Sequence, residues 1–147
     1  MKRADVERYI GEIEFLFAQA MKRIWVREHH ELRELEVTLP QFAALMAISF
    51  KDGCMMRELA EELSLALGTV TGIIDRLVRA GLVKRYRDEK DRRIVRVRLT
   101  QVGEELVRNI KEMRRNHYIS IFEKMDEEDV RALVESLRKF LLVVVGE

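Results

Sequence analysis

The chain has 147 residues, of which 48% are hydrophobic and 36% charged, and its formal net charge is +1. This length fits one folded unit, and the interleaved apolar and charged residues favour an ordered, helix-rich protein over a disordered one. No apolar run approaches the roughly 20 residues that a membrane span needs, and no signal sequence is recognised. We therefore expect a cytoplasmic protein that does not enter a membrane.

The charge is unevenly distributed along the chain. The segment from Lys84 to Arg98 holds eight basic and three acidic residues, a net charge of +5, which leaves −4 for the remainder. A local basic surface attracts nucleic acid without making the whole molecule bind polyanions. A solvated surface is nevertheless the commoner explanation of such a run, so charge alone does not establish nucleic-acid binding.

Two helices are predicted in the first third of the chain. Apolar residues three or four apart predict a long helix over about residues 6–30. A second helix is predicted over residues 41–50, with Thr38 or Leu39 as its cap and Pro40 in its first turn.

A helix-turn-helix is predicted next. A turn at residues 51–53 precedes a short helix over residues 56–63 and a longer one over residues 67–80, which Gly81 is placed to end in the left-handed conformation. The inward face of the longer helix consists of Val70, Ile73, Ile74, Leu77 and Val78. Its other side displays Gly68, Gly72, Asp75, Arg76 and Arg79, with Thr69 and Thr71 on the flanks.

A basic β-hairpin follows this helix. Residues 82–87 and 94–99 have the pattern of strands around a charged loop at residues 88–93. In the second strand, apolar and basic residues alternate, which predicts one apolar and one basic face. The apolar positions are Val95, Val97 and Leu99, and the basic ones are Arg96 and Arg98.

Two further helices are predicted at the end of the chain. Thr100 is expected to cap a helix that runs to about Lys124, and Asp126 is expected to open the last helix. The last helix is apolar on more than one face, because Leu142, Val143 and Val145 lie outside its main apolar stripe. Such a helix needs more than the core of its own subunit to cover it.

A helix-turn-helix followed by a basic hairpin is a mainly α-helical winged helix, which predicts binding to double-stranded DNA. The recognition helix fits the major groove, and the hairpin reaches the backbone or the adjacent minor groove. On the helix the candidate residues are Gly68, Thr69, Thr71 and Gly72 for close approach, with Arg76 and Arg79 for longer contacts. On the hairpin they are Lys84, Arg85, Arg87 and Lys90 for phosphates, and Asp91, Arg92 and Arg93 at the tip, where an arginine suits a narrow minor groove.

The same stretch resembles the MarR (multiple antibiotic resistance regulator) family. The resemblance rests on Leu59-Ala60, Leu63, Thr69-Val70-Thr71, Asp75-Arg76-Leu77, Gly81-Leu82-Val83, Asp91-Arg92-Arg93, Val97-Arg98-Leu99-Thr100 and Gly103. It implies that Asp91 orients Arg93 for the minor groove. It also implies a homodimer on a pseudo-palindromic operator, with dimerisation helices at residues 1–37 and 101–147 and a DNA-binding lobe at residues 38–100.

Many members of that family are repressors that small phenolic or other anionic ligands release from DNA. By resemblance we expect a repressor and a small aromatic or anionic effector. Residues suited to a ligand pocket between the dimerisation helices and the DNA-binding lobe are Phe17, Met21, Trp25, Phe42, Met46, Met113 and Tyr118. The alternative for these seven residues is an ordinary core.

The sequence departs from the family pattern at one position that affects the site. Ala66 stands where the family commonly has Ser or Asp to cap the recognition helix, a loss of about 1 kcal/mol for that helix unless Thr69 compensates. The single cysteine, Cys54, does not lie in the first helix, where redox-sensing members carry theirs, so we expect an inert buried thiol.

Two other classes of function are less well supported. An enzyme or a metal site is disfavoured because His29, His30, His117 and Cys54 show no spacing that joins them, and no cofactor motif is present. The second alternative is a helical protein-interaction or scaffold module that does not bind DNA. Against it stands the basic hairpin beside a helix with a small, polar outer face.

Overall fold

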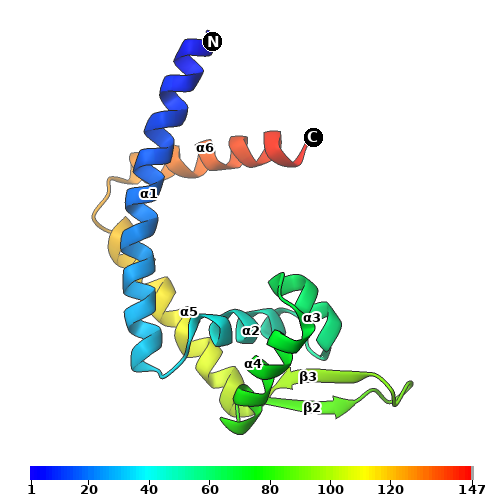
Figure 1. The fold of residues 1–147 in the computed structure, drawn as a ribbon. Helices are drawn as coiled ribbons and strands as arrows, with labels where there is room; N and C mark the ends of the chain where they lie inside the picture. Colours follow the sequence, from blue (N-terminus) through cyan, green and yellow to red (C-terminus); the bar gives the residue numbers. More distant parts are fainter. Residues whose placement is uncertain (147) are drawn as a thin grey trace. The chain divides into compact units, whose positions relative to one another are not determined.

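The computed structural model describes residues 1–146, which are mainly α-helical with one small antiparallel sheet (Figure 1), as the sequence predicted. Two compact units are present: the first spans Met1–Val107, and the second begins at Arg108. The elements are α1 (Arg3–Glu34), α2 (Leu39–Phe50), β1 (Cys54–Met55), α3 (Met56–Leu63), α4 (Leu67–Arg79), β2 (Val83–Arg87), β3 (Val95–Leu99), α5 (Gln101–Phe122) and α6 (Glu127–Val145). No helix in the described part of the chain is long and apolar enough to cross a membrane.

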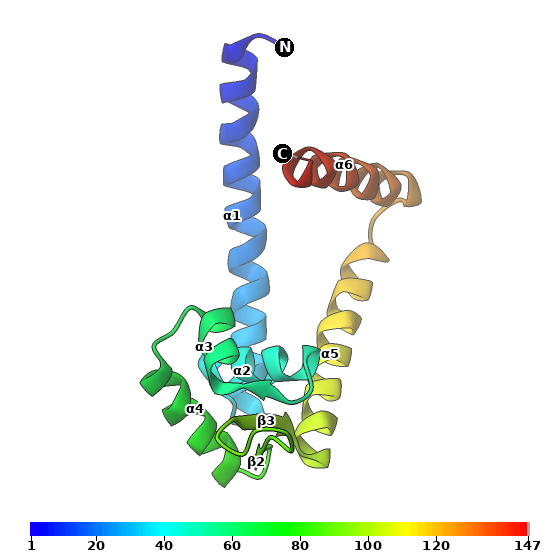
Figure 2. The ribbon, with the colours of Figure 1, turned by 90° about the vertical axis from the view of Figure 1, so that its right-hand side faces the viewer.

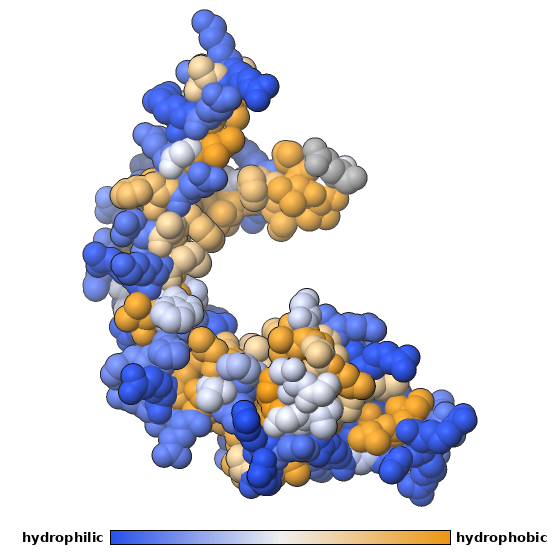
Figure 3. All heavy atoms as spheres, in the orientation of Figure 1, coloured by the Kyte–Doolittle hydropathy of each residue, from blue (hydrophilic) through white to orange (hydrophobic). Residues whose placement is uncertain are grey.

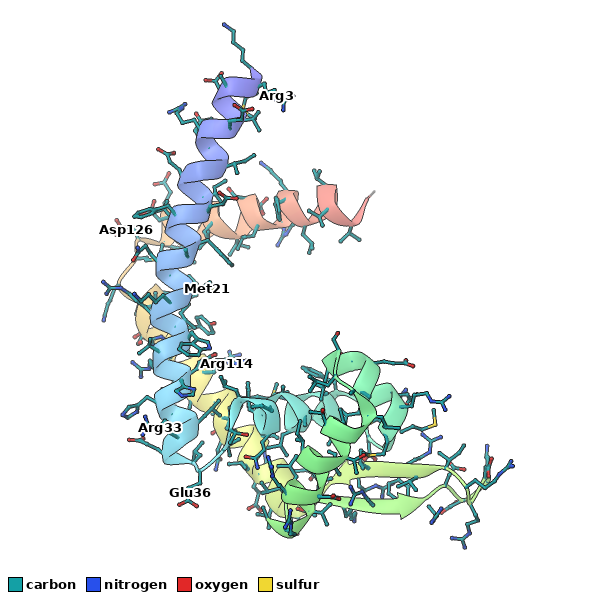
Figure 4. The ribbon with its side chains drawn as sticks, in the orientation of Figure 1. Arg3, Met21, Arg33, Glu36, Arg114 and Asp126 are labelled. Atoms are coloured by element: carbon teal, nitrogen blue, oxygen red, sulfur yellow. The ribbon has the colours of Figure 1, made fainter. Side chains whose placement is uncertain are left out.

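The connection from α1 to α2 is fixed by a turn and a capping box. Glu36, labelled in Figure 4, takes the left-handed conformation at φ 56°. The backbone N–H of Gln41 donates to the Thr38 hydroxyl at 3.3 Å, and the Thr38 N–H donates to the Gln41 side chain at 2.9 Å. These two bonds satisfy donors that the first turn of a helix leaves free, and Pro40 lies in that turn as predicted.

The helix-turn-helix is formed by α3 and α4 (Figure 2). Helix α3 ends at Ser64, whose left-handed conformation (φ 52°) turns the chain toward α4. Helix α4 ends at Gly81, which has a positive φ of 73° as predicted. Its buried residues are Val70, Ile73, Ile74 and Leu77, whereas Val78, expected to face inward with them, is only half-buried.

The sheet has three strands in the order β1-β3-β2. Strands β2 and β3 form the predicted hairpin, and β1 pairs antiparallel with the other edge of β3, so that Cys54 lies opposite Val97. The sequence did not predict β1, because two residues between a turn and a helix are too few to show a period. Of the three apolar positions in β3, only Val97 is fully buried, since it is the one enclosed by a strand on each side.

The start of α5 is anchored to the hairpin. The Thr100 hydroxyl accepts a hydrogen bond from the N–H of Gly103 at 3.1 Å and donates to the carbonyl of Gly81. Thr100 therefore caps α5 as predicted and also holds the turn that ends α4. Gly103 lies so close to the backbone of Leu82 that a β-carbon there would meet the Leu82 carbonyl oxygen.

Helix α6 buries no residue within the chain, although Asp126 precedes it as predicted and much of its surface is apolar (Figure 3). Its exposed apolar side chains are Leu133, Val134, Leu137, Phe140, Leu141, Leu142, Val143, Val144 and Val145. Helix α1 likewise exposes Tyr9, Ile10, Ile13, Phe15, Leu16, Phe17, Met21, Trp25 and Val26. Helices so exposed in a single chain require a further surface to cover them.

Candidate nucleic-acid interface

The outer face of α4 is open and carries small residues in its first two turns. Gly68, Thr69 and Thr71 are exposed, and Gly72 is half-buried. A β-carbon added to either glycine would meet no atom of the protein within 4 Å, so packing within the chain does not require glycine at these positions. Farther along, Arg76 and Arg79 are exposed, with the Arg79 Nε 3.4 Å from the carbonyl of Asp75.

The N-terminus of α4 has no side-chain cap. Ala66 occupies the cap position, and no side chain accepts a hydrogen bond from the first turn. The compensation by Thr69 that the sequence left open is therefore not seen in this turn. Thr71 does not cap the helix either, because its hydroxyl donates to the carbonyl of Leu67 at 2.9 Å and does not accept from a free N–H.

The tip of the hairpin is ordered by two aspartates. Asp88 accepts hydrogen bonds from the N–H groups of Lys90 and Asp91 at 2.8 and 2.9 Å. Asp91 in turn accepts from the N–H, Nε and Nη2 of Arg93 at 3.1, 3.1 and 3.2 Å. The Arg93 guanidinium holds the pKa of Asp91 below its ordinary value, so Asp91 remains a carboxylate and keeps Arg93 in place.

A further hydrogen bond braces the tip from the strand side. Arg87 donates from Nη1 to the carbonyl of Arg92 at 3.0 Å, while the Arg92 side chain forms no ion pair within residues 1–146. The guanidinium groups of Arg92 and Arg93 are both exposed at the tip. The loop therefore exposes two cations, and hydrogen bonds from side chains of the hairpin hold the loop backbone in place.

Two arginines of the basic segment do not belong to its outer surface. Arg96 donates from Nε to Asp88 at 2.6 Å and from Nη1 to the carbonyl of Gly53 at 2.8 Å, and it lowers the pKa of Asp88 to about 2. Arg98 lies over the ring of Tyr86, 4.2 Å from its centre. The expected basic face of β3 is thus occupied by internal contacts that tie the hairpin to the turn before β1.

The hairpin is also joined to the recognition helix. The Nη2 of Arg85 on β2 lies 2.5 Å from Oδ1 of Asp75 on α4. Its neighbour Lys84 is exposed, and neither Lys84 nor Lys90 forms an ion pair in the described part of the chain. Arg85 therefore positions α4 against the hairpin, whereas Lys84 and Lys90 leave their charges available to a polyanion.

Sequence reasoning missed two residues near this surface, Arg57 and Leu67. Both line a hollow of about 540 Å³ between the starts of α3 and α4 and the tip end of the hairpin, which we call the α4–wing hollow. Its lining residues are Met55, Met56, Arg57, Leu67, Thr71, Arg93, Ile94 and Val95. The signal for Leu67 was its place at the start of α4, where it has an apolar side chain that the inward stripe of the helix does not need.

Comparison with known proteins assigns the chain to a family. The family model for MarR matches residues 37–95, which hold α2 to β2 and the hairpin tip. A solved MarR family protein from Bacillus stearothermophilus is 30% identical, with a TM-score of 0.84 over 95% of this chain and 97% of that one. The chain belongs to the MarR family. As members of this family are transcriptional regulators, membership supports the expectation that the protein is not an enzyme.

Other relatives agree with this assignment. The HTH-type transcriptional regulator YsmB of Bacillus subtilis, itself uncharacterised, is 29% identical over 92% of this chain and 88% of its own length. SarZ of Staphylococcus aureus, an HTH-type transcriptional regulator, is 27% identical over 86% of this chain and 84% of its own length. The structure of Streptococcus pneumoniae FabT in complex with DNA has the same fold, with a TM-score of 0.74 at 24% identity over 94% of this chain.

In this MarR protein Cys54 is buried, and burial raises the pKa of its thiol above the ordinary value. A thiol that stays protonated and shielded is a poor nucleophile, which supports the inert role expected from the sequence. No group of three or more histidine, cysteine and acidic side chains suited to a metal ion occurs among residues 1–146.

The residues expected to line a ligand pocket lie on three helices. On α1, Phe17, Met21 and Trp25 are exposed, with Met21 labelled in Figure 4, and the Trp25 ring stacks on His29 at 5.2 Å. Phe42 and Met46 are half-buried on α2. Met113 and Tyr118 are half-buried on the part of α5 that belongs to the second unit. Their joint role stays a prediction.

Proposed function

We propose that this MarR-family regulator binds double-stranded DNA as a homodimer, with α4 in the major groove and the hairpin tip on the adjacent minor groove. The observation that carries the proposal is that ion pairs connect α4 to the hairpin and fix the arginine at the hairpin tip. The Asp75–Arg85 pair links α4 to β2, and the Asp91–Arg93 pair fixes the exposed guanidinium at the tip. A helix and a cation held at a set separation suit two neighbouring grooves, whose spacing is also set.

The contacts divide by role. Gly68, Thr69, Thr71 and Gly72 bring the α4 backbone close to base edges, and Arg76 and Arg79 extend the contact along the groove. Lys84, Arg87 and Lys90 contact phosphates and position the protein without reading sequence, with Arg85 bracing α4 beside them. Arg92 and Arg93, the latter oriented by Asp91, enter the minor groove, where a narrow width enhances the negative potential. In support, a MepR mutant from S. aureus, 23% identical with the same fold, has been solved bound to an oligodeoxyribonucleotide.

The dimer follows from the exposed apolar surface of the terminal helices. We assign residues 1–37 and 101–147 to dimerisation and residues 38–100 to the DNA-binding lobe. A second copy of the chain supplies the surface that α1 and α6 require, and two copies related by a twofold axis read a pseudo-palindrome with half-sites about one helical turn apart.

Repression and its release by an effector extend the same proposal. A dimer on an operator excludes other proteins from that DNA, so repression needs no further contact. A small aromatic or anionic effector among Phe17, Met21, Trp25, Phe42, Met46, Met113 and Tyr118 acts if it favours one spacing of the two recognition helices over another. A tenfold loss of operator affinity requires only about 1.4 kcal/mol of such coupling.

Selection of bound duplexes from a random DNA pool tests the proposal. The expected winner is a pseudo-palindrome bound by two protomers, and it then serves to screen for effectors. A pool without enrichment, together with no duplex binding at low salt, contradicts the proposal and favours the scaffold alternative, for which α1 and α6 would bind other proteins.

A further inference from the structure

We infer that Leu67, at the first position of α4, reads the 5-methyl group of a thymine in the operator half-site. This inference rests on the proposed function, since it assumes that α4 enters the major groove. It adds a chemical class of readout, apolar recognition of thymine, and a residue that carries it.

The first observation is the exposure of Leu67. Its side chain is 52% exposed at the start of the helix, beside a four-residue stripe that is almost completely buried. The core of the lobe is therefore closed without it. A leucine exposed at the leading end of a recognition helix is available to an apolar partner outside the chain.

The second observation is what surrounds Leu67. The outward residues of the first two turns of α4 are Gly68, Thr69, Thr71 and Gly72. None of them has an amide or a guanidinium, the groups that pair bidentately with adenine or guanine. Base readout by this part of the helix is therefore limited to threonine hydroxyls and apolar contact.

The third observation makes base readout by one of the two threonine hydroxyls unfavourable. Thr71 lies one turn after Leu67 on the same side of the helix, and its hydroxyl proton is committed to the Leu67 carbonyl at 2.9 Å. Thr71 thus has no proton to donate to a base acceptor while this bond persists. Its methyl group and the Leu67 side chain are left as the readout groups on this side.

The base edge that matches this surface is thymine. In the major groove, the 5-methyl group of thymine is the one apolar feature that distinguishes a base pair. The glycines at positions 68 and 72 allow a close approach of the helix backbone. The side chains on this face are short, so they reach the base edges only if the backbone comes close. The α4–wing hollow continues the apolar surface from Leu67 through Met56, Ile94 and Val95.

The test replaces single thymines of the selected operator by deoxyuridine, which removes only the 5-methyl group. At one thymine of each half-site, the wild-type protein is expected to bind about fourfold more weakly, the effect of one buried methyl group. For Leu67→Ala the penalty at that position is expected to disappear. Leu65→Ala is the matched control, since Leu65 is also an exposed leucine (39%) but precedes the helix, and it should keep the full penalty.

The outcomes separate the inference from the proposed function. Absence of duplex binding overturns the proposed function. Tight binding that no deoxyuridine weakens, or a half-site without thymine, overturns the inference alone, and this measurement needs only the wild-type protein. A penalty that persists in full in Leu67→Ala also overturns it, because the methyl group would then be read by another residue.

Discussion

Arg85 and Asp75 join the wing to the recognition helix, with 2.5 Å between the guanidinium Nη2 and the carboxylate Oδ1. Each partner is about a third to a half exposed, so the pair is hydrated and its role is geometric more than energetic. It fixes the direction in which β2 leaves α4. If α4 and the wing both contact DNA as proposed, they are already joined before DNA binds, which lowers the ordering cost of binding.

Lys84→Ala is expected to weaken binding to operator and to unrelated duplex alike. Lys84 is exposed next to Arg85 and has no ion pair within the described residues, so we expect its charge to act on phosphates and not on base edges. The plot of log affinity against log salt concentration should become shallower by about one unit. The contrast is Arg85→Ala, which should reduce operator affinity more than non-specific affinity, because it frees α4 from the wing. Equal losses for the two variants on both duplexes would contradict the division of roles.

Arg93→Ala is expected to cost about 1–3 kcal/mol of operator affinity, because it removes the guanidinium that we propose enters the minor groove. The measurement is fluorescence anisotropy with the selected operator. Arg3→Ala is a matched control: Arg3 and Arg93 are 93% and 92% exposed, and each holds a carboxylate from Nε at 3.1 Å. Unchanged affinity for Arg93→Ala, or an equal loss for Arg3→Ala, would show the wing tip to be misassigned.

Gly72→Ala is expected to stabilise the protein while weakening its binding to DNA. A β-carbon at Gly72 meets open space, and alanine in a helix interior gains about 0.5–1 kcal/mol over glycine. In the complex the same methyl group would separate α4 from the base edges. Urea unfolding and operator titration should therefore move in opposite directions.

Gly103→Ala, in contrast to Gly72→Ala, is expected to destabilise the protein. A β-carbon there meets the Leu82 carbonyl, so a destabilisation of about 1–3 kcal/mol is expected from overpacking.

If Gly72→Ala left operator affinity intact, close backbone approach at α4 would be wrong.

Asp88→Asn is expected to destabilise the wing in a pH-dependent way. The pKa of Asp88 is about 2 in the folded protein, lowered mainly by the hydrogen bond from Arg96, against an ordinary value of 3.8. Because the folded pKa is the lower one, the carboxylate stabilises the fold above pH 4, and this contribution is lost as the pH falls to about 2. The difference in unfolding free energy between wild type and Asp88→Asn should thus be largest above pH 4 and shrink toward pH 2.

Asp52→Asn is the control for that titration. Asp52 lies 3.6 Å from Arg98 and is more exposed than Asp88, so its replacement should change unfolding little at any pH. A constant difference between wild type and Asp88→Asn from pH 6 to pH 2 would show that the Asp88–Arg96 bond does not hold the wing.

Leu141→Glu is expected to convert a dimer into monomers. Leu141 is exposed on α6 within one chain, so a charge there leaves the protomer fold intact but blocks an apolar interface. Analytical ultracentrifugation should give about half the wild-type mass with unchanged helical content by circular dichroism. Phe50→Glu, which changes an exposed apolar residue in the DNA-binding lobe, should leave the mass unchanged. A monomeric wild type would refute the assignment of α1 and α6 to dimerisation.

The order of the elements and several of their ends could be predicted because local signals specify them. Helix α3 begins and ends at the predicted residues, and Thr38, Thr100 and Gly81 act at the predicted caps. Strand β1 and the role of Arg96 could not be predicted. Arg96 contacts Asp88 eight residues away and Gly53 forty-three residues away, and alternation in a strand gives the face of a side chain but not its partner.

In the candidate site, too, local sequence signals identified the residues, whereas contacts between distant residues could not be predicted. Sequence reasoning named the cations of the wing, but only the fold separates those that brace it, such as Arg85 and Arg96, from those left available, such as Lys84. The sequence places Leu67 outside the inward stripe of α4, but only the fold shows that the core is closed without it and that its side chain is exposed.

Operator affinity as a function of salt concentration tests the central claim most directly. The protein is titrated with the selected duplex from about 50 to 200 mM salt. Two wings and two recognition helices that neutralise 6–10 phosphates predict a fall in affinity of roughly 10³–10⁵ over this range. An affinity that does not change with salt, or no binding at the lowest concentration, would contradict DNA recognition by this surface.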